Sequence, residues 1–195
     1  MSFSLIIYVF FILCFINISL TIYNNILLLN KDLKKQWIKV EKYYKIKNDL
    51  INILINDIKL TEKINYKKNY KLINAIEKIY SINNSITFNV YNKLNKEKIE
   101  IFKKKQELLK NSLNIFLLIF DKYYYYKYKV KIKKRNKYIQ NFYDIKYKID
   151  LTENLINYEI KKFNEKVKKY NLYINKFPIK FFNKILYKYN YYMQI

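Results

Sequence analysis

Residues 3–22 read FSLIIYVFFILCFINISLTI, an uncharged run that constrains how the rest of the chain can fold. Its polar exceptions are Ser4, Asn17, Ser19 and Thr21, and the first charged residue of the chain is Lys31. About 20 residues at a rise of 1.5 Å each form a helix of roughly 30 Å, the thickness of a bilayer's hydrocarbon core. The sequence therefore predicts that residues 1–22 form a transmembrane anchor.

A cleaved signal peptide is the alternative interpretation of this apolar run. Such a peptide begins with a basic region and ends at a cleavage site of small residues such as Ala. Only Met1 and Ser2 precede the run, and Ala75 is the one alanine in the chain. These features favour a helix that is retained as a single membrane span.

The charges that flank the anchor predict its orientation. Between Lys31 and Leu50 there are seven Lys against three acidic residues, whereas the other flank has no charged side chain. Basic flanks stay on the cytoplasmic side of a membrane. We therefore expect a protein of the cell (inner) membrane with its N-terminus outside and its helical domain in the cytoplasm.

Apolar residues recur three or four positions apart after the anchor, as expected for one face of an α-helix. They are Leu33, Trp37, Val40, Tyr44, Ile51, Leu54 and Ile58. Lys47 occupies the one position of this spacing that is polar. No Pro or Gly interrupts the segment, so we expect the anchor and the stripe to form one continuous helix.

A second stripe with the same spacing lies near the C-terminus and contains one extra step of four residues. Its members are Phe142, Ile145, Ile149, Thr152, Ile156, Ile160, Phe163, Val167, Tyr170, Ile174 and Phe177. Pro178 follows and disfavours helix at the residue before it, which predicts the end of the helix. Residues 179–195 then form an aromatic-rich tail that could contain a docking helix.

Weaker stripes between these two predict further helices. One consists of Ile73, Ile76 and Tyr80, and another of Phe102, Gln106, Leu109, Leu113, Phe116 and Phe120. Asn83–Ser85 is interpreted as a connection, and Ile115–Phe120 as the most buried turns. Helices with one apolar face must pack on one another. The predicted fold is therefore all-α: a transmembrane helix followed by an elongated antiparallel helical bundle over residues 23–178.

One stretch departs from the helical pattern. Residues 123–134 read YYYYKYKVKIKK, in which apolar residues and Lys alternate from Tyr126 as in a strand. We interpret residues 122–137 as a basic Tyr/Lys insertion. It could stack on bases and bind phosphate, lie on anionic lipid, or be a low-complexity loop without function.

The composition limits the functions that can be considered. The chain has no Gly and no His, one Cys and a net charge of +24. Gly, Ala, Pro and Arg, which are rare here, have GC-rich codons, so we infer an AT-rich genome such as a bacterial symbiont carries. General acid–base catalysis most often uses His, and phosphate loops need Gly. We therefore expect no enzymatic activity, no metal and no cofactor.

Two segments carry a resemblance to a known family. Residues 23–54, YNNILLLNKDLKKQWIKVEKYYKIKNDLINIL, resemble the opening signature of the LemA family, and residues 152–178, TENLINYEIKKFNEKVKKYNLYINKFP, are similar to its closing signature. Ile38, Asn52 and Ile160 depart from the usual Ser, Pro and Arg, and the Gly-containing tail motif is replaced. The resemblance implies a membrane-anchored, elongated helical bundle of bacterial type with no assigned reaction.

These observations predict a non-catalytic scaffold or protein-interaction role at the membrane. The candidate structural or interaction residues are Trp37, Asp49, Glu153, Asn154, Asn164, Asn171, Phe177 and Pro178. The aromatic members are also explained as core residues, and the Asn members as polar groups that set the register of a seam. The expected partners are the lipid bilayer and a protein, either unidentified or a second copy. The alternative is a basic protein that binds anionic lipid or nucleic acid, although it has no recognised nucleic-acid motif.

Overall fold

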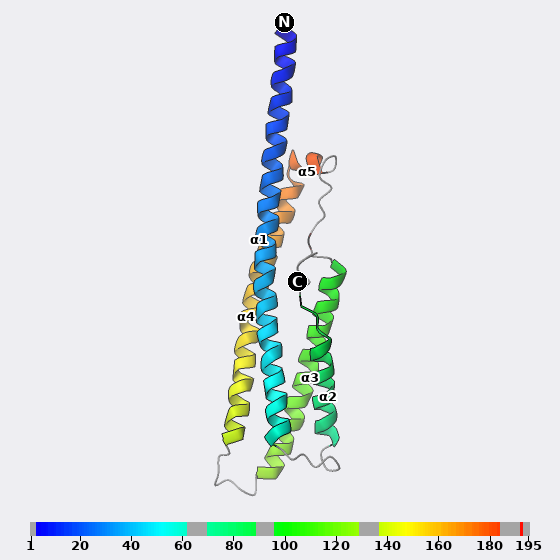
Figure 1. The fold of residues 1–195 in the computed structure, drawn as a ribbon, viewed down its shortest axis with the longest axis vertical. Coiled ribbons are helices and arrows are strands. Elements are labelled where there is room, and N and C mark those ends of the chain that lie inside the picture. Colours follow the sequence, from blue (N-terminus) through cyan, green and yellow to red (C-terminus); the bar gives the residue numbers. More distant parts are fainter. Residues whose placement is uncertain (1–2, 62–69, 89–95, 129–136, 184–191, 193–195) are drawn as a thin grey trace. The chain divides into compact units, whose positions relative to one another are not determined.

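The computed structural model describes residues 3–61, 70–88, 96–128, 137–183 and 192 (Figure 1). Within these ranges every regular element is a helix, so the prediction of an all-α fold is confirmed. The helices are α1 (Phe3–Thr61), α2 (Tyr70–Ser85), α3 (Lys96–Tyr128), α4 (Lys137–Asn175) and α5 (Ile179–Phe182). The chain divides into a terminal unit, residues 1–38 and 159–195, and a central unit, residues 39–158.

Helix α1 is continuous from Phe3 to Thr61, as the absence of Pro and Gly predicts. It contains a stretch long and apolar enough to cross a membrane. The large apolar side chains from Phe3 to Leu20 are exposed, and the first buried ones along the helix are Ile22 and Ile26. The first part of α1 therefore presents apolar side chains that remain exposed beside the described residues of this chain.

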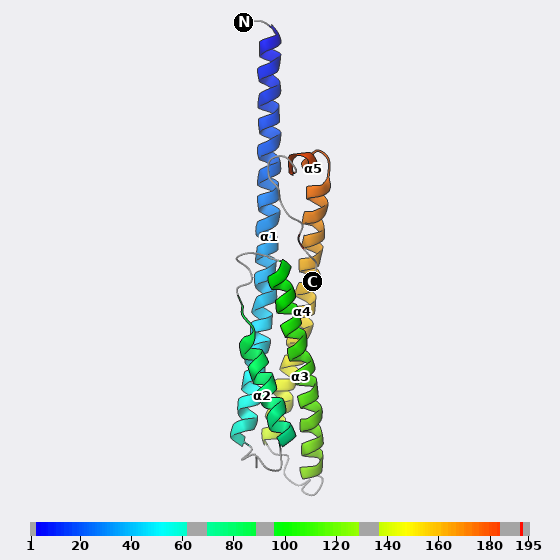
Figure 2. The ribbon, with the colours of Figure 1, turned by 90° about the vertical axis from the view of Figure 1, so that its right-hand side faces the viewer.

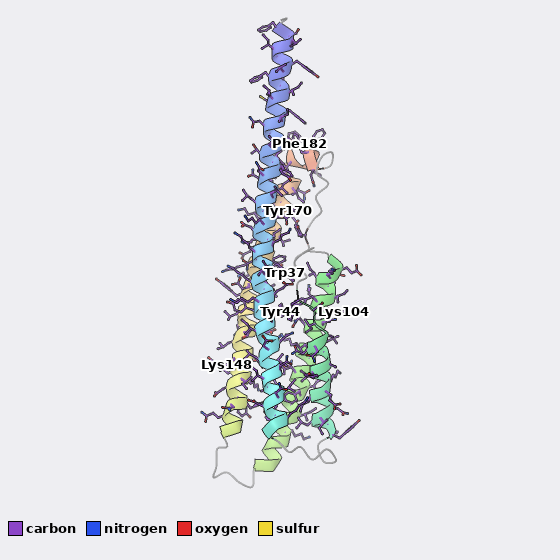
Figure 3. All side chains as sticks on the ribbon, viewed as in Figure 1. Trp37, Tyr44, Lys104, Lys148, Tyr170 and Phe182 are labelled. Atoms are coloured by element: carbon purple, nitrogen blue, oxygen red, sulfur yellow. The ribbon has the colours of Figure 1, made fainter. Side chains whose placement is uncertain are left out.

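In the terminal unit, α1 packs antiparallel to the end of α4. The ring of Trp37 lies 5.3 Å from that of Phe163, and both side chains are fully buried. Nearer the N-terminus, the ring of Phe15 lies 5.1 Å from that of Phe182 in α5. Figures 2 and 3 show α5 and the labelled Phe182 beside α1. Residue numbers fall along α1 from Trp37 to Phe15 while those of the contacting residues rise from Phe163 to Phe182. The two segments therefore run antiparallel.

The central unit contains the end of α1, the start of α4, and helices α2 and α3. Lys59 of α1 lies over the ring of Tyr80 of α2, with its Nζ 4.9 Å from the ring centroid. At the C-terminal end of α2, Lys105 of α3 donates a hydrogen bond to the carbonyl of Ser85. The rings of Phe120 in α3 and Phe142 in α4 stack at 3.9 Å. Each contact joins helices that run in opposite directions, which confirms an antiparallel bundle.

Burial confirms the stripe predicted for α3, and it confirms the stripe predicted for α1 except at Tyr44, which is half-buried. In α3 all six expected side chains are buried: Phe102, Gln106, Leu109, Leu113, Phe116 and Phe120. In α1 the buried face is wider than the stripe and adds a second row, Glu41, Asn48 and Ile55, spaced seven residues apart. A helix that contacts neighbours on two sides buries more than one row of side chains, which explains the added row.

The predicted face of α2 is wrong by one position. The buried side chains are Leu72, Ile76, Ile79 and Asn83, whereas Ile73 is half-buried and Tyr80 is exposed. Asn83–Ser85, predicted to be a connection, is instead the last turn of the helix. The side chains of Ser81 and Ser85 hydrogen-bond carbonyls three residues earlier, so these polar residues stay within the helix.

One further expectation for α3 is wrong. Within the run Ile115–Phe120, Ile115 and Leu118 are exposed, so the run has two faces and is not uniformly buried. The helix continues to Tyr128, into the first part of the Tyr/Lys insertion, where a strand-like alternation begins. A helix already formed extends by one hydrogen bond per residue, which outweighs a short local alternation. The remainder of the Tyr/Lys stretch, residues 129–136, lies outside the described residues.

Helix α4 ends at Asn175, close to the end that Pro178 predicts. Phe177 was expected to close the apolar stripe, but its side chain is 89% exposed. Residues 176–178 form a turn, so the helical spacing that would direct Phe177 into the seam no longer applies. The tail prediction is met in part by α5, whose Ile179 and Phe182 are buried, while residues 184–191 and 193–195 lie outside the described residues.

Candidate functional site: polar contacts in the helix seams

A lysine lies in the core of the central unit. Lys47 follows Tyr44 by three positions and precedes Ile51 by four, so helical geometry places it on the buried face of α1. Its side chain is 4% exposed, and its Nζ lies 2.5 Å from Oε2 of Glu153 in α4. Lys110 of α3 approaches Oε1 of the same carboxylate at 3.2 Å. One carboxylate therefore links three helices.

The ionisation of Glu153 depends on these two lysines. Burial alone would raise the pKa of this carboxyl, but the hydrogen bond and charge of Lys47, helped by Lys110, hold the pKa below its ordinary value of 4.5. Nearby, burial and the charge of Glu153 raise the pKa of Tyr44 to about 12. At neutral pH the cluster thus consists of a carboxylate, two ammonium groups and a neutral phenol.

A second polar contact in the central unit joins α1 and α2. The side-chain amide of Asn83, which is 5% exposed, donates hydrogen bonds to the carbonyl of Asn48 at 3.0 Å and to Oδ1 of Asn52 at 2.8 Å. A buried amide must find partners or lose several kcal/mol relative to water, on the order of 1–3 in mutational data. The contact therefore fixes the height of α2 against α1.

The terminal unit has a polar contact of its own. Nε2 of Gln36 donates to Oε2 of Glu159 at 2.5 Å and to the main-chain oxygen of Glu159 at 3.2 Å. Both side chains are buried, and Glu159 occupies the core position that the sequence pattern assigned to Ile160. Between the buried residues Ile156 and Phe163, the buried position of the helix is therefore Glu159, while Ile160 is only half-buried. A polar residue that is paired can occupy a position that apolar spacing alone gives to its neighbour.

Near the C-terminus, Tyr192 contacts both α4 and α1 of the terminal unit. Asn171 of α4 donates to the carbonyl of Tyr192 at 2.9 Å and accepts from its main-chain N–H at 3.1 Å. The hydroxyl of Tyr192 donates to Oδ1 of Asn30 in α1 at 2.8 Å. Its ring lies 4.9 Å from that of Tyr170. The side-chain amide of Asn171 thus both donates to and accepts from the main chain of Tyr192, as the main chain of a neighbouring β-strand would.

The structure separates the predicted candidate residues into contacts and surface positions. Trp37, Glu153 and Asn171 make the contacts described above, and Asn164 is half-buried with an interaction of its own. The exposed candidates are Asp49, Asn154, Phe177 and Pro178. Pattern analysis missed Lys47, Gln36, Glu159 and Asn83 as contact residues. The signal available for them was a polar residue at a position where the helical period expects an apolar one.

The contacts described above pair charged and polar side chains of neighbouring helices with one another. Among the described residues, no group of three or more His, Cys, Asp or Glu side chains lies together as a metal site requires. The half-buried carboxylate of Glu153 and the buried carboxylate of Glu159 are held by lysine and glutamine side chains of neighbouring helices. Such contacts specify which helices meet and at what height.

The pairs Lys47–Glu153 and Gln36–Glu159 lie on the two segments that carried the family resemblance, whereas Lys110, Asn83 and Tyr192 lie outside them. The model of the LemA family matches residues 36–194, most of the chain. The chain belongs to the LemA family. The match to LemA begins at Gln36, so the exposed apolar part of α1 lies ahead of it. No curated protein and no solved structure matches this chain.

Replacing Glu153 with Gln tests the buried ion pair. The substitution leaves the ammonium of Lys47 buried without a counter-charge. We expect a loss of about 3 kcal/mol in unfolding free energy at pH 7, the low end for breaking a buried pair, because Glu153 itself is 25% exposed. The measurement is denaturant unfolding of the full-length chain in detergent, followed by circular dichroism.

The lowered pKa of Glu153 also predicts how the effect of this substitution changes with pH. The pKa of Glu153 is lowered by folding, so its contribution is complete above 4.5 and is lost as the pH falls through the lower folded-state value. The difference in unfolding free energy between the wild type and Glu153→Gln should therefore become smaller as the pH falls. Asp150→Asn, an exposed carboxylate on the same helix, is the matched control. A difference of equal size at pH 7 and pH 3 would contradict the ion-pair account.

Proposed function

We propose that this LemA protein is a non-catalytic helical scaffold, held in a bacterial cell membrane by α1, which assembles with a second copy of itself. The observation that carries the proposal is the exposed apolar surface of α1 from Phe3 to Leu20. Exposing a continuous apolar surface of this size to water is unfavourable, whereas lipid solvates it. The helix then continues without a break into the seams of the bundle.

The distribution of charge supports a structural role over catalysis. The chain contains no His, and its single cysteine, Cys14, lies within the apolar part of α1. A thiolate there would be in lipid, where a charged nucleophile is strongly disfavoured. In the central unit, the carboxylate of Glu153 neutralises the buried ammonium of Lys47. A scaffold needs helices held in a defined register, which is what these pairs supply.

The surface of α4 supports assembly with another helix. Tyr147, Leu151, Leu155 and Tyr158 are exposed, and their steps of four, four and three residues place them on one face of the helix. Two copies inserted in one membrane in the same orientation hold residues of the same number at the same height. The row of one copy can therefore meet the same row of another, as in an isologous interface.

Charge asymmetry supports a cytoplasmic bundle. Seven Lys follow the apolar run between Lys31 and Leu50, and no charged side chain precedes it. Lysines close to a span keep their flank on the cytoplasmic side. The proposed location is therefore the inner cell membrane, with the N-terminus outside.

The anchoring is tested by a charge placed in the span. Leu13→Arg puts a charge where the helix would meet the bilayer centre, at a cost of roughly 2.5–3.5 kcal/mol on insertion scales. We expect the wild-type chain to stay in the membrane pellet after carbonate extraction and the variant to shift toward the supernatant. Ile53→Arg, at an exposed position in the central unit, should leave the distribution unchanged. Release of the wild-type chain by carbonate would refute the anchor.

The orientation is tested by protease accessibility. Trypsin cleaves after Lys and Arg, of which the chain has 39, and none precedes Lys31. In cells whose outer layers have been opened but whose inner membrane is intact, we expect the bundle to resist trypsin. After the inner membrane is lysed it should be digested. Digestion before lysis would reverse the orientation and leave the anchoring proposal in place.

Self-assembly is tested by cysteine crosslinking within the membrane. In a Cys14→Ser background, we expect Leu155→Cys to form a disulfide-linked dimer on mild oxidation. Asn157→Cys, exposed on the same helix but turned away from the row, should remain monomeric. Equal dimer formation by the two variants, or none by Leu155→Cys, would argue against this face.

A further inference from the structure

Two exposed phenylalanines follow α4 where a soluble protein would carry polar residues. Phe177 is 89% exposed and Phe181 is 56% exposed, while Ile179 and Phe182 between and beside them are buried. Lys176 and Lys180, both exposed, alternate with the two rings. The segment 176–182 thus presents an outward face of aromatic rings and ammonium groups, and an inward face of apolar side chains.

The depth of this segment is set by its contact with α1. The ring of Phe182 lies 5.1 Å from that of Phe15, within the terminal unit. The uncharged part of α1 ends before Lys31. A span needs about 20 residues, and every window of that length between Phe3 and Asn30 includes residue 15. Wherever the bilayer sits on α1, Phe15 is inside it, and α5 is beside Phe15.

The main chain of the segment is suited to such a place. The N–H of Lys180 donates to the carbonyl of Lys176, and those of Phe181 and Phe182 donate to the carbonyl of Pro178. Pro178 has no N–H to satisfy. Polar main-chain groups near hydrocarbon must be bonded internally, because lipid offers no partner. The turn after α4 therefore enters lipid at little cost for these groups.

We infer that residues 176–182 form a second membrane contact, with Phe177 and Phe181 inserted at the acyl-chain boundary and Lys176 and Lys180 at anionic headgroups. The inference rests on the proposed anchoring by α1. Counting from Ile22, Phe15 lies seven residues, or about 10 Å, inside the span. Amphipathic segments bury their apolar face by about 5–10 Å at this boundary. The lysine side chains can reach back to the headgroups by extending their stems.

Tryptophan quenching by brominated lipid tests this contact. Phe177→Trp and Phe181→Trp are made separately in the full-length chain and placed in vesicles of phosphatidylcholine and phosphatidylglycerol. The wild type supplies the baseline, because its one tryptophan, Trp37, is fully buried. We expect both added tryptophans to be quenched, more strongly by bromine near the headgroup than by bromine deep in the chain.

Two further variants separate the possible failures. Phe11→Trp, exposed on α1, reports the anchor, and Ile53→Trp, exposed in the central unit, should match the wild-type baseline. If Phe11→Trp is quenched but residues 177 and 181 behave like residue 53, the second contact is refuted and the anchor stands. If Phe11→Trp is also unquenched, anchoring and the second contact both fail. Blue-shifted emission from 177 and 181 without quenching would mean that protein, not lipid, covers the rings.

Discussion

The structure depends on polar groups that the helical period forces into its seams. Lys47 and Gln36 of α1 lie on the buried face because their neighbours along the helix are core residues. A buried ammonium without a counter-charge is far more costly than one with a partner. Glu153 in the central unit and Glu159 in the terminal unit supply partners from α4. Each pair forms at only one relative height of the two helices, whereas apolar stripes alone tolerate a slip of one turn.

Helix α1 changes its surroundings along its length without changing its conformation. Up to Leu20 its large apolar side chains are exposed, and from Ile22 onward those on one face are buried while others, such as Leu28 and Ile53, stay exposed. Polar side chains first become buried at Gln36, after the apolar run has ended. This order is the one expected if the first part of α1 lies in lipid, as proposed. Lipid offers them nothing, whereas a seam between helices can offer a carboxylate, an amide or a carbonyl.

Much of this fold could be predicted from the sequence, since long stripes are hard to misinterpret. The six positions of α3 from Phe102 to Phe120, the continuity of α1 and the end of α4 all follow from spacing and from the positions of proline. The errors occur where the pattern is short or polar. Three residues of α2 defined its face, and a shift of one position exchanged Ile73 for Leu72. Asn83 was interpreted as a connection because Asn usually favours turns.

The candidate contacts were predicted less well, for a physical reason. Glu153 and Asn171 stood out in the family signature, but their partners Lys47 and Tyr192 did not. Which residues become partners depends on their distance in three dimensions, and the spacing along the sequence does not give that distance. Ile160 was chosen over Glu159 because apolar residues are the default occupants of a core. Phe177 was placed in the stripe because the period was extended past the last helical turn. In each case the missing information was which side chain lay opposite.

The high positive charge has a different meaning at the surface and in the core. Among the described residues, Lys47 is the one buried lysine, while others such as Lys104 and Lys148 lie exposed on α3 and α4 (Figure 3). An exposed lysine needs no particular partner, because water solvates its ammonium at any surface position. A buried lysine, in contrast, requires a carboxylate at one defined place. The single pair of Lys47 and Glu153 therefore constrains the fold more than the net charge of +24 does.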